Sequence, residues 1–285
     1  MRIVLALMIS LTLATGAEAA PGKAVPRLIF PVVGTTSYTD DFGSPRPGGP
    51  HQGIDIVAAR RAPAVAVEAG TVEFWTTSAN AGCMLYLHGA SGTTYLYIHL
   101  NNDLTAHNDN RGECVAGTAY APKLKDGAHV AAGQLVGYVG DSGDADGIHP
   151  HLHFEVHPGG GAAVDGYPYL RKAPPLMFYA KAGSTVSLSI TGTILSSFGA
   201  GPGLELKTSS VQPNLTKPIA VSRPVVLALA DNAQVSMDIP GVTVGLEALL
   251  AGMRATVYTL PVRATLAAQR GDANALTASR ILITH

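Results

Sequence analysis

The feature that most constrains the fold of this chain is a short segment in which apolar and polar residues alternate. The segment runs from Pro150 to Val156 and has the sequence PHLHFEV. A period of two residues is typical of a β-strand with one buried face. On the other face His151 and His153 would project together, with their Cβ atoms about 6–7 Å apart. In such a pair one imidazole could bind a metal ion and the other could transfer a proton beside it. A surface strand can also carry two histidines without a function.

Composition favours an all-β architecture for the rest of the chain. The 285 residues include 32 glycines and 19 prolines, and only 6% are aromatic. Many short runs rich in Val, Ile, Leu and Thr lie between these turn residues, as in folds built from short strands. The formal net charge is −1 and the basic residues are scattered, which argues against nucleic acid as a partner.

The N-terminal residues predict export. Met1-Arg2 precedes an apolar run from Ile3 to about Leu13, and the small-x-small sequence Ala17-Glu18-Ala19 follows. This pattern is typical of a secretory signal peptide over residues 1–19, cleaved after Ala19, with a retained anchor helix as the alternative. No later run is long and apolar enough to cross a bilayer. We therefore expect a secreted or cell-envelope protein, extracellular or periplasmic, without a membrane span after cleavage.

The two cysteines, Cys83 and Cys114, are the only ones in the chain. In an exported protein such a pair most simply forms a disulfide, and two free buried thiols are the alternative. A bridge here would close a loop of about thirty residues and contribute roughly 3–4 kcal/mol on the chain-entropy model.

The exported part of the chain is long enough for two domains. We expect the first to span residues 20–172, because Pro174-Pro175 marks a linker. Residues 173–285 are predicted to form about five strands, with one short helix over residues 246–253 before the fourth strand. Two of the strands are expected at residues 225–230 and 234–239. The predicted architecture is a small β-barrel, of which an OB-like barrel is one form.

Two further segments of the first domain carry side chains that suit a metal site. His51 and Asp55 lie four residues apart, and Gly53 with the β-branched residues around it favours a strand or extended loop there. His99 ends a run that is predicted to pair as a hairpin with residues 83–88. A catalytic zinc usually takes three protein ligands and leaves a fourth position to water, and two imidazoles with one carboxylate are a suitable set. The candidate residues are therefore His51, Asp55, His99, His151 and His153.

These segments resemble the signature segments of the lysostaphin/LytM-type zinc metallopeptidases, which are peptidoglycan endopeptidases. The matching segments are His51-x-x-x-Asp55, Tyr97-Ile98-His99-Leu100 and His151-Leu152-His153-Phe154-Glu155. The features around them also match: Phe42-Gly43, Gly127-x-x-Val130-x-x-Gly133, Val139-Gly140-Asp141-Ser142-Gly143 and Tyr169-Leu170. The resemblance extends from about Leu28 to Lys172.

The resemblance implies a fold, a cofactor and a set of roles. The fold would be an antiparallel β-sheet peptidase domain of the duplicated hybrid motif type, with the metal in a groove walled by loops. His51, Asp55 and His153 would hold Zn²⁺. His151 would act as general base and His99 as donor to the oxyanion. The substrate would be the peptide cross-links, either stem peptides or cross-bridges, of bacterial peptidoglycan, hydrolysed by a zinc-activated water.

Other interpretations of the same residues stay open. A non-catalytic domain of this fold could bind cell wall or activate a partner hydrolase, although such relatives lack some of the ligands that this chain retains. An unrelated metal barrel such as a cupin would leave the His51 and His99 segments unexplained. For the C-terminal domain we expect a stabilising or docking role, with wall binding as the alternative. Glu155 lies on the same face as His153 and could orient it by a hydrogen bond.

Two loops depart from the commonest form of the family. Residues 101–125 make a longer connection than expected after the His99 segment, and residues 144–149 make a longer loop before Pro150. Both would border the groove and affect its shape. His149 is an additional candidate for a groove residue, with a solvated loop histidine as the simpler interpretation.

Overall fold

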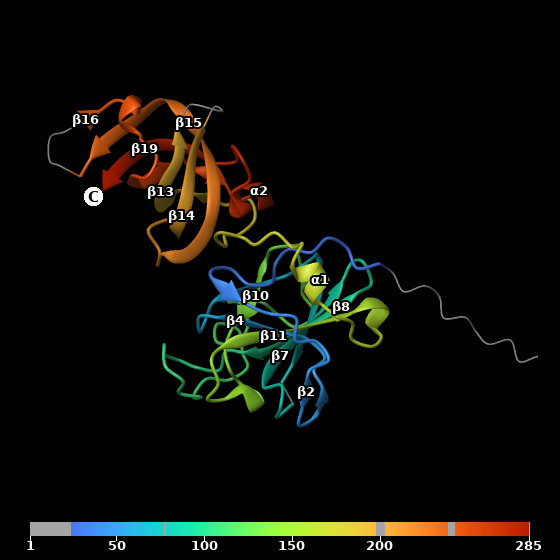
Figure 1. Ribbon diagram of the computed structural model, residues 1–285. Helices are drawn as coiled ribbons and strands as arrows, with labels where there is room; N and C mark the ends of the chain where they lie inside the picture. The colour runs from blue at the N-terminus through green and yellow to red at the C-terminus, as the bar shows by residue number, and fades with distance from the viewer. Residues whose placement is uncertain (1–23, 77, 198–202, 239–242, 285) are drawn as a thin grey trace, which may run out of the picture.

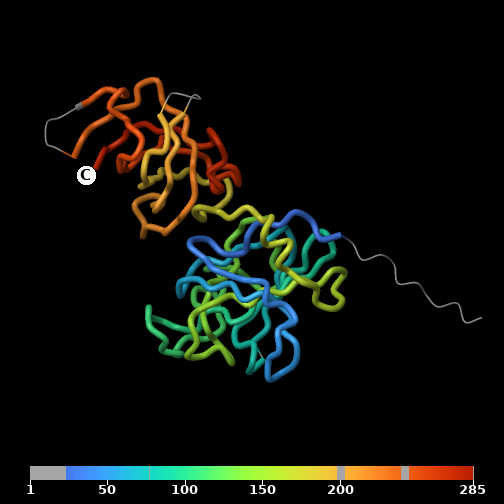
Figure 2. The backbone as a smooth tube through the Cα atoms, viewed as in Figure 1, coloured from blue at the N-terminus to red at the C-terminus, as the bar shows by residue number. Residues whose placement is uncertain are grey.

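The computed structural model describes residues 24–76, 78–197, 203–238 and 243–284 (Figure 1). The expected signal peptide, residues 1–19, lies outside the described residues. The chain forms two β-rich bodies, the first running from blue to yellow-green and the second from yellow to red (Figure 2). In the described part of the chain, no helix has both the length and the apolar character needed to span a bilayer.

The first body is built on a seven-stranded sheet in which every pair is antiparallel. In pairing order its strands are β1 (Thr36–Ser37), β4 (Ile54–Ala58), β11 (His151–His157), β8 (Thr94–Leu100), β7 (Cys83–Gly89), β6 (Gly70–Trp75) and β9 (His129–Val130). The expected strand at residues 150–156 is thus β11, and the expected hairpin is β7 with β8. The sheet confirms the prediction of an antiparallel β domain.

Smaller elements surround this sheet. They are the pair β2 (Pro45–Arg46) and β3 (Gly49–Pro50), the pair β5 (Pro63–Val65) and β10 (Leu135–Tyr138), the 3₁₀ turns η1 (Gly143–Ala145) and η2 (Pro158–Gly160), and the helix α1 (Tyr167–Leu170). The long connection after β8 is tied back to β7 by a disulfide between Cys83 and Cys114, whose Cα atoms lie 5.1 Å apart. The expected disulfide is therefore present.

Burial of one face of β11 sets the position of its polar face. Leu152, Phe154 and Val156 are each 0% exposed. The ring of Phe154 packs against those of Tyr95 and Tyr97, with centroids 5.9 and 5.3 Å away. Burying each such side chain contributes roughly 1.5–3 kcal/mol. Because a shift of one residue would exchange the two faces, this packing fixes the register of β11 and thereby the side on which its histidines lie.

The second body is a closed barrel of five strands. In pairing order they are β13 (Leu188–Ser197), β14 (Gly203–Pro213), β15 (Ile219–Met237), β19 (Thr277–Thr284) and β17 (Arg254–Thr259), which pairs again with β13. Only β15 and β19 run parallel among these pairs. β16 (Thr243–Val244) extends the sheet beside β15, and β12 (Thr185–Val186) pairs with β18 (Val262–Arg263). The expected small barrel is confirmed.

The prediction of a helix at residues 246–253 is wrong. The structure has only a 3₁₀ turn there, η3 (Leu246–Ala248), and the helix of this body is α2 (Leu266–Arg270). The backbone N–H of Gly252 donates to Ile194, and that of Ile194 donates to Met253, so the end of the segment pairs with β13. Pairing with a neighbouring strand outweighs the helical propensity of the leucines. The two strands expected at 225–230 and 234–239 are parts of the single strand β15 up to Met237.

Candidate metal centre and catalytic histidines

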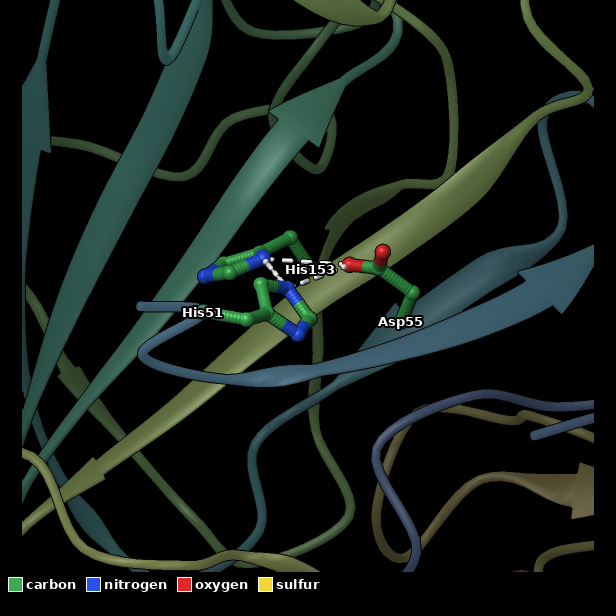
Figure 3. Close-up of side chains that lie close together, drawn as sticks. All are labelled: His51, Asp55 and His153. Carbon is green, nitrogen blue, oxygen red and sulfur yellow. Dashed lines mark hydrogen bonds and ion pairs between the residues drawn. The ribbon is translucent and has the colours of Figure 1, made fainter. Parts of the chain in front are cut away.

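Three potential ligand atoms from two neighbouring strands meet at one point of the sheet (Figure 3). Asp55 of β4 and His153 of β11 are register partners, and His51 lies just before β4. Nε2 of His51 lies 2.9 Å from Nδ1 of His153, and Oδ1 of Asp55 lies 3.1 Å from each of these nitrogen atoms. The structure therefore brings together the three residues expected to hold the metal.

The loop between His51 and Asp55 needs a glycine. A Cβ atom at Gly53 would lie 2.6 Å from Nε2 of His153 and 2.7 Å from the carbonyl oxygen of Phe154. Both distances are shorter than any real Cβ contact, so a larger residue would displace the imidazole of His153. Gly53 thus allows β4 and the His51 loop to approach β11 closely.

Hydrogen bonds on the far side of each ring decide which nitrogen faces the centre. Nδ1 of His51 lies 3.0 Å from the carbonyl oxygen of Asp41, and a carbonyl can only accept, so this nitrogen carries the proton. Nε2 of His153 lies 2.9 Å from Oε1 of Glu155 and donates to it. Nε2 of His51 and Nδ1 of His153, the nitrogens free of these bonds, then point at each other and at Asp55. The hydrogen bond expected for Glu155 is thus observed.

The second carboxylate oxygen of Asp55 is held away from the histidines. Nη2 of Arg46 donates to Oδ2 of Asp55 at 2.8 Å and to Oδ2 of Asp41 at 3.2 Å. Burial acts to raise the pKa of Asp55, but the hydrogen bond to His153 and the nearby imidazoles outweigh it and lower the pKa well below its usual range. Asp55 is therefore a carboxylate with one oxygen free for the centre.

The electrostatics around His153 favour a cation. Burial acts to lower the pKa of His153, but hydrogen bonds to Asp55 and Glu155 outweigh it and raise the pKa to about 9. For Glu155 burial acts in the opposite direction, and its bonds to His153 and His157 lower its pKa to about 2. With this pKa, Nδ1 of His153 carries a proton at neutral pH as long as no metal ion is bound, and it donates to Oδ1 of Asp55 at 3.1 Å. A metal ion would displace that proton and leave two nitrogen lone pairs and one carboxylate oxygen as ligands, 2.9–3.1 Å apart. This donor set fits Zn²⁺, which binds such atoms at about 2.0–2.2 Å.

The two further histidines lie beside this triangle. Nε2 of His151 is 3.8 Å from Oδ1 of Asp55, and Nδ1 of His151 donates to the carbonyl oxygen of His149 at 3.1 Å. The ring of His99 lies 5.1 Å from that of His151, centroid to centroid. Nδ1 of His99 donates to the carbonyl oxygen of Ser142 at 2.8 Å. Both imidazoles therefore present an unprotonated Nε2 when they are neutral.

His99 adopts a rare backbone conformation and stays neutral. Its φ angle is 60°, in the left-handed region, which usually costs of order 1–3 kcal/mol and is found most often at functional sites. Burial and then the neighbouring His151 lower the pKa of His99 to about 4. At neutral pH its Nε2 atom is thus an acceptor, and it becomes a donor only after it takes up a proton.

Comparison with known proteins agrees with this geometry. Residues 49–165 match the model of peptidase family M23. That range contains all five candidate residues. This part of the chain is similar to peptidase family M23.

Individual relatives cover the same part of the chain as the peptidase family M23 region. An L-Ala--D-Glu endopeptidase of Bacillus subtilis is 28% identical over 153 residues, which are 50% of this chain and 42% of that protein. Among solved structures, a putative glycyl-glycine endopeptidase lytM from Ruminococcus gnavus is 28% identical with a TM-score of 0.39, covering 51% of this chain and 59% of that chain. The catalytic domain of lysostaphin from Staphylococcus simulans is 25% identical with a TM-score of 0.37, covering 48% and 92%. The chain therefore spans less than half of the curated relative.

The two long loops of the M23 region meet beside the histidines. The amide nitrogens of Asn108 and Asn110 both donate to Oδ1 of Asp146 at 2.8 Å, so residues of the loop after β8 contact the loop before Pro150. His149 lies on this second loop with its ring 6.0 Å from that of His151, centroid to centroid. The loop before Pro150 therefore lies beside His151, and the loop after β8 contacts that loop.

Several residues of this centre were not found by sequence reasoning. Arg46 and Asp41 orient Asp55 and His51, and His157 donates to Glu155 at 2.6 Å. Their sequence neighbourhoods, a turn rich in Pro and Gly and the end of a strand, carry no signal for such roles. Only the pairing of β4 with β11 brings their partners within reach.

Proposed function

We propose that the chain is an exported zinc metalloendopeptidase that hydrolyses peptide cross-links of bacterial peptidoglycan. The observation that carries this proposal is the triangle of Nε2 of His51, Oδ1 of Asp55 and Nδ1 of His153, with edges of 2.9–3.1 Å and two further imidazoles beside it. Similarity of residues 49–165 to peptidase family M23 supports the reaction class. The match to an L-Ala--D-Glu endopeptidase supports a stem peptide as substrate.

His51, Asp55 and His153 would hold the ion. When bound, Zn²⁺ lowers the pKa of a coordinated water and polarises the carbonyl of the amide to be cleaved. The chain contributes the orientation of these ligands, because Asp41, Glu155 and Arg46 hold the atoms that face away from the ion. Ligands held in this way lose little freedom on binding the metal.

His151 is proposed as the general base. In the neutral ring Nε2 is the unprotonated nitrogen, because Nδ1 donates to the carbonyl of His149, and Nε2 lies 3.8 Å from the ligand oxygen of Asp55. It can therefore take the proton of the attacking water and later give it to the leaving amine. His99 is proposed as the donor to the oxyanion. Since its Nδ1 donates to Ser142, it fills this role only as an imidazolium, after Nε2 has taken up a proton.

Export and domain division are part of the proposal. A signal peptide over residues 1–19 would bring the protein to the extracellular or periplasmic side, where the disulfide between Cys83 and Cys114 is stable. We propose a domain boundary at the Pro174-Pro175 linker, after residue 172 and before Met177. Leu176 still packs with Ile29 and Val33 of the first body, whereas the core of the barrel begins at Met177. For the barrel, residues 173–285, we propose a stabilising or docking role.

Digestion of purified peptidoglycans tests the activity. Walls with direct and with glycine-containing cross-links are incubated with the mature protein, and the released fragments are identified by mass spectrometry. We expect cleavage of amide bonds in at least one wall, loss of cleavage with a chelator and recovery with Zn²⁺. Zinc-loaded protein that cleaves none of these walls, but binds them or stimulates another hydrolase, would support the non-catalytic alternative instead.

A further inference from the structure

The segment Gly140–Ser142 forms hydrogen bonds with both proposed catalytic histidines. The backbone N–H of Gly140 donates to the carbonyl of His99 at 3.1 Å, and its carbonyl accepts from the N–H of His151 at 3.0 Å. The carbonyl of Ser142 accepts from Nδ1 of His99 at 2.8 Å. The position of this short segment therefore determines the orientation and the tautomer of His99.

The hydroxyl of Ser142 fixes this residue further. Oγ of Ser142 donates to the carbonyl of Leu100 at 2.6 Å and accepts from the N–H of Cys83 at 2.9 Å. These bonds tie Ser142 to β7 and β8, the latter being the strand that carries His99. Between Gly140 and Ser142 lies Asp141, whose side chain contacts neither histidine.

Asp141 is completely buried and is paired with a single arginine. Its side chain is 0% exposed. Nη1 and Nη2 of Arg60 donate to its two carboxylate oxygens at 2.5 and 2.6 Å. The planar fork of a guanidinium matches a carboxylate in this two-bonded geometry, which a lysine cannot reproduce. Arg60 follows β4, the strand that carries Asp55, so the pair links the ligand strand to the segment behind His99.

The same guanidinium also holds the loop after β8. Nη1 of Arg60 donates to Oδ2 of Asp103, which is likewise 0% exposed. Oδ1 of Asp103 accepts from the backbone N–H groups of Asp109 and Asn110 at 2.7 and 2.9 Å and so shapes that loop. The hydrogen bond to Asp141, against the opposing effect of burial, raises the pKa of Arg60. One partly buried arginine thus binds two fully buried aspartates that have different neighbours.

We propose that Arg60 is a positioning residue that acts through Asp141 and the carbonyl of Ser142 to hold His99 as its Nδ1–H tautomer. Its unprotonated Nε2 then lies 3.7 Å from Oδ1 of Asp144, on the side of the ring away from Ser142. This inference rests on the proposed function only for what His99 then does to the substrate. Removing one partner of a buried ion pair leaves the other charge uncompensated, which is strongly unfavourable. Loss of the pair therefore removes one anchor of the segment. The carbonyl of Ser142 then depends on the two hydroxyl bonds of that residue alone, and Nδ1 of His99 is held less firmly.

Two isosteric substitutions separate this role from a general effect on folding. Asp141→Asn and Asp103→Asn each remove one buried negative charge, and each leaves Arg60 with one carboxylate. The two substitutions affect different segments. Asp141→Asn affects the segment Gly140–Ser142, which bonds to His99, whereas Asp103→Asn affects the loop after β8. Arg60→Lys and Arg61→Lys form a second matched pair, because Arg61 donates to the carbonyl of Asp103 but has no bond to Asp141 among the described residues.

The primary measurement is the ¹⁵N spectrum of the histidine side chains, recorded on full-length mature protein with and without Zn²⁺. In the unsubstituted protein His99 should show a single Nδ1–H tautomer at neutral pH. In Asp141→Asn and in Arg60→Lys we expect a second, Nε2–H population of His99, whereas Asp103→Asn and Arg61→Lys should leave the His99 signals unchanged. If Asp141→Asn does not fold, the comparison of Arg60→Lys with Arg61→Lys tests the proposal by itself, because both substitutions keep the positive charge of the side chain.

Kinetics provide a second measurement. Asp141→Asn should lower kcat about tenfold to a hundredfold with bound zinc unchanged and KM within about twofold, as for other residues that orient a functional group. His99 signals that are unaltered in Asp141→Asn and Arg60→Lys, or altered equally in Asp103→Asn, would overturn the proposal. A protein that hydrolyses no peptidoglycan but shows the expected tautomer changes would contradict the proposed function alone.

Discussion

Nε2 of His51 and Nδ1 of His153 lie 2.9 Å apart, although the two residues are 102 positions apart in the chain. The two imidazoles thus use different nitrogen atoms toward the same point. Each is held there by an acceptor on the far side of its ring, the carbonyl of Asp41 or the carboxylate of Glu155. Five predictions follow from this centre and from the body that carries it.

Asp55→Ala or His153→Ala should abolish retention of zinc. Either change leaves two protein ligands, and two ligands hold the ion poorly. The zinc content of purified protein, measured by mass spectrometry of the metal, should fall from about one ion per chain to near zero. Ser91→Ala, distant in sequence from the centre, serves as a control and should keep its zinc. Full zinc content in Asp55→Ala would show that the ligand set is different.

His151→Ala should keep zinc and lose turnover. The residue lies next to the ligand triangle without belonging to it, so its loss removes the proposed base and not the metal. We expect kcat to fall at least a hundredfold, the usual scale for a general base. Turnover on an isolated muropeptide and zinc content are measured on the same preparation. Loss of the metal from this variant would mean that His151 and His153 have exchanged roles.

Glu155→Gln should weaken zinc binding without removing a ligand. Glu155 accepts from Nε2 of His153 at 2.9 Å and fixes the tautomer in which Nδ1 is free. Loss of such an orienting partner typically costs ten- to a hundredfold in metal affinity, which competition with a chelator can measure. Glu73→Gln is the matched control, since Glu73 bonds to His88 at 2.8 Å on another part of the sheet. Equal affinities of the two variants would contradict this role of Glu155.

Acid should destabilise the metal-free protein through His99. Its pKa is about 4 in the folded protein against an ordinary value of 6.5, because burial disfavours the charged form. Between these values the unfolded chain binds more protons, so stability falls as the pH decreases from 6.5 to 4. The full contribution is about 3 kcal/mol. Denaturant unfolding at several pH values should show a shallower dependence in His99→Gln. An identical slope in both proteins would rule out this assignment.

The disulfide should stabilise the first body. Cys83 and Cys114 are separated by 31 residues, and the chain-entropy model gives roughly 3–4 kcal/mol for a loop of this length. The double variant Cys83→Ala/Cys114→Ala should therefore unfold at a lower denaturant concentration. Reduction of the unsubstituted protein should reproduce the loss. If reduction leaves the unfolding midpoint unchanged, the bridge contributes no stability.

The sequence by itself determined the strands that carry the site. Alternation in residues 150–156 placed His151 and His153 on one face, because burial of Leu152, Phe154 and Val156 tolerates only one register. The residue pattern offered five candidates, and the resemblance of the His51, His99 and His151 segments to a known family implied which three would be ligands. In the barrel the strands were largely predictable for the same reason, whereas the helix at residues 246–253 was not, since pairing with β13 decided that segment.

Only the tertiary structure decided which atoms act. A tautomer depends on the acceptor behind the ring, and those of His51 and His99 are carbonyl groups 10 and 43 residues away. Backbone carbonyls leave no trace in a sequence, because every residue has one. Likewise Arg60 looks like an ordinary surface arginine until folding buries it between Asp103 and Asp141. Local sequence patterns specify the strands and their buried faces. Contacts between distant segments determine which nitrogen atoms carry protons and which side chains are charged.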